Sequence, residues 1–154
     1  MTEYYLRKWN DPILRKECRK VEDFSSLENL VSSMRSIMKK YEGLGLAAPR
    51  VGDDRSVLLA QIGSMPKLFI NPQIVSAAGY IPFIEGCLSF PGVTVPKLRR
   101  YRIDLRYQDE KGMQKEETFR GLNSIVLQHE IDHLHGRLLY QLFKKKVTLN
   151  GIKQ

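Results

Sequence analysis

The chain has 154 residues, and hydrophobic residues make up 42% and charged residues 27%, as in a single globular domain. No apolar stretch approaches the roughly 18 residues of a membrane span, and the N-terminus has no apolar signal-peptide core. We therefore expect a cytoplasmic protein without a membrane partner. The net charge of +8 favours anionic partners such as RNA, although it also serves solubility. Two cysteines, Cys18 and Cys87, exclude a disulfide framework.

The first periodic segment covers residues 26–42, where apolar residues recur with helical spacing. Ser25 or Ser26 is placed to cap the start of this helix, and Gly43 to end it. The positions expected to face the core are Leu27, Leu30, Val31, Met34, Ile37, Met38 and Tyr41. The segment is predicted to be an amphipathic N-terminal helix.

The periodicity then changes to that of strands. Residues 56–62 and 67–75 are predicted strands, and the apolar segment 80–90 is a strand that carries Cys87 near its end. Residues 98–107 alternate, with Tyr101, Ile103, Leu105 and Tyr107 on one face and Arg100, Arg102, Asp104 and Arg106 on the other. The arginine row is typical of a solvated sheet face, and an RNA-docking surface is the alternative. After a turn, residues 114–119 are predicted to return as the partner strand.

A second helix is predicted for residues 122–135, with Gly136 in the left-handed position that often ends a helix. One side carries Leu122, Ile125, Val126, His129 and His133, and the other carries Leu127, Ile131, Leu134 and Leu138. A helix that is apolar nearly all round is expected to be buried. The predicted fold class is therefore α+β, with antiparallel strands packed around this central helix.

Polar residues inside that helix indicate a metal site. His129 and His133 lie one turn apart, so both imidazoles can bind one ion, and Glu130 lies where a carboxylate can reach a metal-bound water. Burying these groups without partners would be costly. The alternative is a pair of hydrogen-bonded core histidines that bind nothing.

A catalytic metal site generally has three protein ligands and one open position. His135 is a poor third ligand because it is turned about 200° around the helix axis from His133. Cys87, at a strand end between glycine and leucine, is the remaining candidate. Cys18, in a charged run, is expected to lie near the surface or to be a small packing residue.

Three segments resemble, in order and spacing, the motifs of the peptide deformylase family: GLGLAAPR at 43–50, EGCLS at 85–89 and QHEIDHLHG at 128–136. The segments NDPILRKECRKV near the start and FINPQIV at 69–75 also resemble that family, so the resemblance covers nearly the whole chain. It implies a catalytic domain over residues 1–142, followed by a short basic tail at 143–154.

The resemblance implies an activity and its cofactor. The family removes the N-formyl group from formyl-methionine at the start of new polypeptides, so N-formyl-methionyl nascent chains are the implied substrates and formate the implied product. Cys87, His129 and His133 become the implied metal ligands and Glu130 the acid/base. The family typically uses Fe(II), and Zn(II), Ni(II) or Co(II) can replace it.

Two donors are implied for the formyl oxygen: the backbone N–H of Leu88 and the side-chain amide that ends the first motif. The family pattern GxGLAAxQ has glutamine at that place, whereas this chain has Arg50. An arginine can donate hydrogen bonds with a full positive charge. It can also turn away to Glu42, Asp53 or Asp54 and leave the donor pair incomplete.

A pocket is expected for the methionine side chain. The residues predicted to line it are Gly43, Leu44, Gly45, Leu122, Ile125 and Val126. The two glycines suit a loop whose backbone passes close to the substrate. Beside the motifs, Glu85 is predicted to support a metal ligand and Gln128 to orient a backbone group.

Two other functions stay open. One is a peptidase that cuts internal bonds, against which Cys87 and the other two motifs count. The second is a degenerate, non-catalytic metalloprotein that binds the ribosome or the nascent chain, favoured by Arg50 and the charge but not by the intact Glu130. A transient contact of the tail with ribosomal RNA competes with a simple solvated end. We expect a monomer, and the short tail hints at a viral or organellar type.

Overall fold

The computed structural model describes residues 2–87 and 90–138, and of Cys87, Phe90, Pro91 and Val93 it describes the backbone only. Five antiparallel strands form one sheet in the order β1 (Gly45–Ala47), β2 (Val57–Ile62), β3 (Met65–Ala78), β6 (Arg102–Gln108) and β7 (Gln114–Arg120). A separate antiparallel pair consists of β4 (Ile81–Cys87) and β5 (Phe90–Arg99). The predicted α+β class with antiparallel strands is confirmed.

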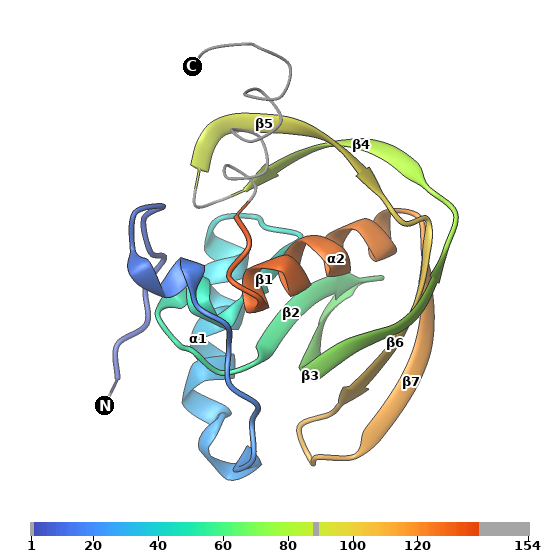
Figure 1. Cartoon of the computed structure of the whole chain (residues 1–154). Helices are drawn as coiled ribbons and strands as arrows, with labels where there is room; N and C mark the ends of the chain where they lie inside the picture. Colours follow the sequence, from blue (N-terminus) through green and yellow to red (C-terminus); the bar gives the residue numbers. More distant parts are fainter. Residues whose placement is uncertain (1, 88–89, 139–154) are drawn as a thin grey trace.

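The helices are α1 (Glu28–Lys40) and α2 (Leu122–Leu134), with short 3-10 helices η1 (Pro12–Arg15), η2 (Phe24–Ser26) and η3 (Ala48–Val51). Figure 1 shows α2 between the β4–β5 pair and the β1–β2 side of the five-stranded sheet. Both β1 and η3 contact α2. Three separate parts of the chain, β1, η3 and β4, therefore bring residues to this helix.

The first four residues of β2, 57–60, are buried on both faces of the sheet, which explains their unbroken apolar run. Val57 and Leu59 pack in one core cluster with the buried side of α1, which includes Met34. Leu58 and Ala60 pack in a second cluster with Leu127, Ile131 and Leu134 of α2. Successive strand residues point to opposite faces, so this sheet separates the two helices.

The start and the end of α1 differ from the prediction. The N-cap is Leu27, which makes no capping side-chain bond, while Ser25 and Ser26 belong to η2, which Asp23 caps. The left-handed residue that follows the helix is Glu42, with φ 53°, and not Gly43. The two serines predicted as caps belong to an additional 3-10 turn before the helix, and hydrophobic periodicity alone does not predict such a turn.

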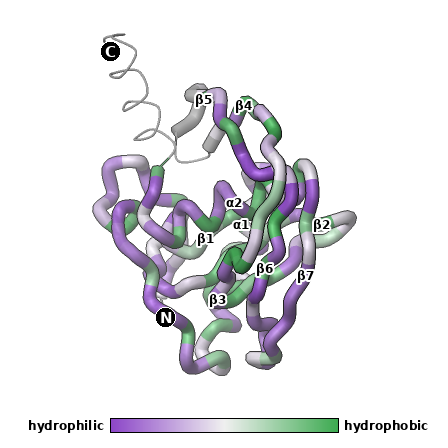
Figure 2. Tube along the Cα trace, turned by 45° about the vertical axis from the view of Figure 1, so that its right-hand side comes forward, coloured by the Kyte–Doolittle hydropathy of each residue, from purple (hydrophilic) through white to green (hydrophobic). Residues whose placement is uncertain are grey.

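The segment predicted as one strand over residues 98–107 is divided between two sheets. Strand β5 ends at Arg99, the chain bends, and β6 begins at Arg102. Ile103, Leu105 and Tyr107 are buried as predicted, but Tyr101 lies in the bend and is 45% exposed. The expected partner strand appears as β7, and Figure 2 shows that much of it is hydrophilic.

Helix α2 ends as predicted, because Gly136 follows the C-cap with φ 70°. His135 pairs with Glu17 across 2.7 Å at the surface. Among the described residues, no helix is both long and apolar enough to cross a membrane. The predicted domain boundary at residue 142 and the tail 143–154 lie outside the described residues.

Candidate active site

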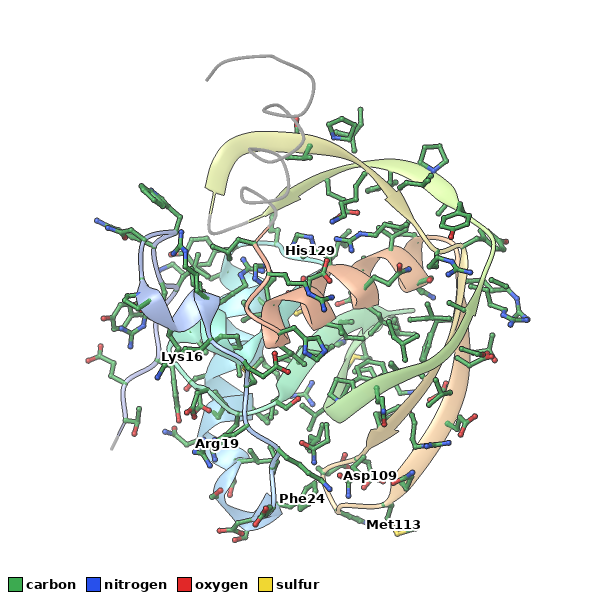
Figure 3. The ribbon with its side chains drawn as sticks, in the orientation of Figure 1. Lys16, Arg19, Phe24, Asp109, Met113 and His129 are labelled. Atoms are coloured by element: carbon green, nitrogen blue, oxygen red, sulfur yellow. The ribbon has the colours of Figure 1, made fainter. Side chains whose placement is uncertain are left out.

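Helix α2 brings three polar side chains together. The ligand atoms of His129, Glu130 and His133 all lie within 4.8 Å of one another. The Nε2 atoms of the two histidines are 3.3 Å apart. Figure 3 shows His129 on the side of α2 that faces the β4–β5 pair. His129 and Glu130 also line a cavity, as expected for a reaction centre rather than for core packing.

The histidine pair has the spacing that a metal ion requires. Zn–N bonds of about 2.0–2.1 Å and tetrahedral angles place two ligand nitrogens roughly 3.3–3.4 Å apart. The observed separation of 3.3 Å matches this value. A hydrogen bond between the rings would also fit the distance, but two imidazole nitrogens and a carboxylate oxygen within 4.8 Å of one another are a donor set typical of a metal site. The donor set therefore fits a divalent ion.

His133 is held in the form that binds metals. Burial lowers its pKa well below 6.5, and the charges of Arg50, of His129 when protonated, and of Arg99 lower it further. Its imidazole is consequently neutral at physiological pH. A neutral imidazole has the lone pair that a metal ligand must offer.

Glu85 sets the orientation of His129. Burial alone would raise the pKa of Glu85, but hydrogen bonds from Arg99 and His129 outweigh it and lower the pKa to about 2. The ionised carboxylate only accepts, so His129 Nδ1 donates to Glu85 Oε1 across 3.0 Å. The lone pair of this ring then lies on Nε2, which faces His133. This contact is the kind predicted for Glu85, whose support of a metal ligand stays a prediction.

Arg99 anchors Glu85 and was missed by the sequence reasoning. It donates to both carboxylate oxygens of Glu85 at 2.6 and 2.7 Å, and to Asp132 of α2 at 2.7 Å. This chain of ion pairs fastens the β4–β5 pair to α2. Nothing in the local pattern reveals the contact, because it depends on two strands pairing and then crossing the helix. Gln128 was predicted correctly, since it bonds both backbone groups of Arg100.

A cavity of about 690 Å³ opens onto the site. All the pocket residues predicted from the sequence line it, namely Gly43, Leu44, Gly45, Leu122, Ile125 and Val126. Arg50, His129 and Glu130 line it as well. Leu44 is 52% and Leu122 49% exposed, whereas Ile125 is buried. Gly45 lies in β1 rather than in the expected loop.

Arg50 turns into the site instead of away from it. Its side chain, in η3, is buried, and its Nη1 lies 3.4 Å from Glu130 Oε1. Two of the acidic residues considered as its partners are paired elsewhere: Asp53 with Arg55 and Asp54 with Arg19. The alternative in which Arg50 turns away to Glu42, Asp53 or Asp54 gives way to a pairing with Glu130, the carboxylate of the HExxH motif.

The second motif is described only in part. Cys87 is the last residue of β4, the strand that brings Glu85 to His129. The side chain of Cys87 and the whole of Leu88 lie outside the described residues. The roles expected for these two residues therefore stay predictions.

Comparisons with known proteins identify the family. The model of the polypeptide deformylase family matches residues 4–148. A peptide deformylase of Dictyoglomus turgidum is 41% identical over 145 residues, covering 94% of this chain and 95% of that protein. The crystal structure of peptide deformylase from Thermotoga maritima matches with a TM-score of 0.87 and 37% identity, covering 92% of this chain and 97% of that one. That of a probable peptide deformylase from Synechococcus phage S-SSM7 matches with a TM-score of 0.85 and 32% identity, covering 90% and 99%. The chain belongs to the polypeptide deformylase family.

Proposed function

We propose that this protein is a metal-dependent hydrolase that removes the N-formyl group from the N-terminal formyl-methionine of new polypeptides and releases formate. The observation that carries the proposal is the convergence of the His129, Glu130 and His133 side chains, of which His129 and Glu130 line a cavity with apolar walls. The family match over residues 4–148 supports the reading of these three side chains as the reaction centre of a deformylase.

The metal ligands in this proposal are Cys87, His129 and His133. The 3.3 Å separation of the imidazole nitrogens supports the pair, and the position of Cys87 at the end of β4 supports the third ligand. A thiolate suits a borderline-soft divalent ion, and we propose Fe(II), with Zn(II), Ni(II) or Co(II) as substitutes. When bound, the ion supplies Lewis-acid chemistry that acidifies water and polarises the formyl carbonyl.

Glu130 moves the proton. Its carboxylate accepts a proton from the attacking water as the oxygen bonds to the formyl carbon. It then returns that proton to the nitrogen as the C–N bond breaks, so the peptide leaves with a neutral amine. Negative charge collects on the formyl oxygen meanwhile, and the backbone N–H of Leu88 is the proposed donor to it.

The cavity selects the side chain of the first residue. Ile125 and Val126 of α2 offer an apolar wall, and Leu122 lies at the same side. Gly43, Leu44 and Gly45 line it too, and glycine leaves room for the substrate backbone. A flexible, unbranched methionine side chain suits such a pocket better than a charged or branched one.

We also propose that α2 is the central helix of a catalytic domain over residues 1–142, with α1 as its amphipathic N-terminal helix. The burial of Leu127, Glu130 and His133 on α2 and of Met34 on α1 supports this arrangement. The protein acts as a cytoplasmic monomer in this proposal, and its basic tail at 143–154 touches the ribosome transiently. The net charge of +8 supports that contact.

Formate release from formyl-Met-Ala-Ser tests the proposal. The protein is prepared without oxygen and loaded in turn with Fe(II), Co(II), Ni(II) and Zn(II). Acetyl-Met-Ala-Ser and an internally cleavable peptide serve as control substrates, and Glu130→Gln as the control protein. We expect formate from the formyl peptide alone, lost in the variant. Stoichiometric metal binding without turnover would favour a non-catalytic relative, and cleavage of the internal peptide would favour a peptidase.

A further inference from the structure

The carboxylate of Glu130 is held from two sides. A Cβ atom at Gly45 would lie 2.8 Å from both Cγ and Oε2 of Glu130, so the backbone of β1 packs directly against this side chain. On the other side, Nη1 of Arg50 lies 3.4 Å from Oε1 of Glu130. One oxygen thus faces the strand and the other faces the guanidinium.

Arg50 is itself firmly placed. It lies in η3, which follows β1 directly, and both elements contact α2. The backbone N–H of Arg7 donates to the carbonyl of Arg50 across 2.7 Å. The side chains of Arg50 and Glu130 are only 2% and 5% exposed. Two charges buried this deeply interact far more strongly than a surface pair, and each is costly without the other.

We infer that Arg50 is the positioning residue of Glu130 and acts through this carboxylate rather than as a donor to the formyl oxygen. The inference rests on the proposed function. A glutamine at this place is neutral and shorter, so it cannot form the ion pair. Arg50 and Glu130 therefore work as one unit in this chain. Restoring the family's residue, by Arg50→Gln, lowers activity instead of raising it.

Kinetics test the inference through a double-mutant cycle. In the wild-type background, Arg50→Gln is expected to lower kcat roughly 10- to 100-fold, the scale of a misplaced catalytic group, with KM changed less than about two-fold. In a Glu130→Gln background the same change is expected to have no further effect. If turnover of Glu130→Gln is below detection, the coupling between the two side chains is measured by stability instead. Arg50→Lys keeps the charge and should recover part of kcat, while Gly45→Ala, which displaces the carboxylate, should lower it.

Stability provides a readout that does not depend on turnover. In metal-free protein, Arg50→Gln and Glu130→Gln should each lower the urea midpoint, because each leaves a buried charge uncompensated. The double variant, Arg50→Gln with Glu130→Gln, should lose less stability than the sum of the losses measured for the two single variants. Arg55→Gln is the matched control, since it breaks the Arg55–Asp53 pair, whose side chains are 12% and 11% exposed, away from the cavity. Its effect should add to that of Glu130→Gln in both assays.

The outcomes separate this inference from the proposed function. An effect of Arg50→Gln that persists in the Glu130→Gln background would overturn the inference and make Arg50 a direct donor to the substrate. A rise in kcat, or additive losses of stability, would overturn it too. If the wild type has no turnover, or Glu130→Gln keeps full turnover, the proposed function fails. The catalytic part of the inference then fails with it, and the stability cycle alone decides whether the two side chains are coupled.

Discussion

Replacing Glu85 by glutamine tests how the β4–β5 pair supports the site. The change keeps the shape of the side chain and removes its charge. Arg99 then loses the carboxylate that it contacts at 2.6 and 2.7 Å, but keeps Asp132. Breaking a buried pair on one side costs about 3–5 kcal/mol. Because Asp132 still compensates Arg99, we expect the lower end, about 3 kcal/mol.

The pKa of Glu85 leads to the same magnitude. Its value of about 2, against an ordinary 4.5, corresponds to about 3 kcal/mol of favourable interaction with the charged carboxylate. A loss of this size lowers the melting temperature by roughly 6–12 °C in a domain of this length. His129 also loses the acceptor that fixes its ring, so metal affinity should fall about 10- to 100-fold.

Urea unfolding of metal-free protein measures the stability, and competition with a chelator measures the metal affinity. Glu117→Gln is the matched control, because Glu117 pairs with Lys67 and Tyr107 at a site where its side chain is 40% exposed. We expect that variant to lose no more than about 1 kcal/mol and to bind metal normally. A loss below about 1 kcal/mol for Glu85→Gln, with unchanged metal affinity, would refute the argument that this network supports His129.

Three further outcomes are expected. Gly136→Ala should lower the free energy of unfolding by about 2 kcal/mol or more in urea titrations, because φ is 70° and the new Cβ would lie 2.6 Å from the carbonyl of Arg15; an unchanged midpoint would contradict this. Burial raises the pKa of Asp53, but the hydrogen bonds from Arg55 outweigh burial and hold this pKa below 3.8. The charged Asp53 therefore stabilises the fold above pH 3.8, and this stabilisation is lost as the pH falls through the pKa of the folded state. Asp53→Asn should make the free energy of unfolding depend less on pH in this acid range. Burial, and after it the nearby acidic groups, raises the pKa of Cys18 from 9.0 to about 12. Alkylation of this thiol in the folded protein should therefore be roughly 10³-fold slower than in denaturant, and Cys18→Ser identifies the modified site. Equal rates in the two conditions would contradict the expectation.

The sequence by itself determined the class of fold and the chemistry. Helical spacing identified α2 and its Gly136 terminus, a short apolar run identified β2, and the period of two identified the core face of β6. Local side-chain geometry decides these features, so a single segment contains the information. The histidines at 129 and 133 are one turn apart in any helix, and the motifs at residues 43–50 and 85–89 supplied the family.

The tertiary structure alone decided how the site is supported. The bend at Tyr101 divides one alternating segment between two sheets, and Arg99 at its edge reaches Glu85 and Asp132. The pairing of Arg50 with Glu130 joins residues 80 positions apart. Such contacts depend on how strands and helices pack over one another. The periodicity of a single segment does not predict these contacts, because the energy of a buried ion pair depends on partners that only the folded chain brings together.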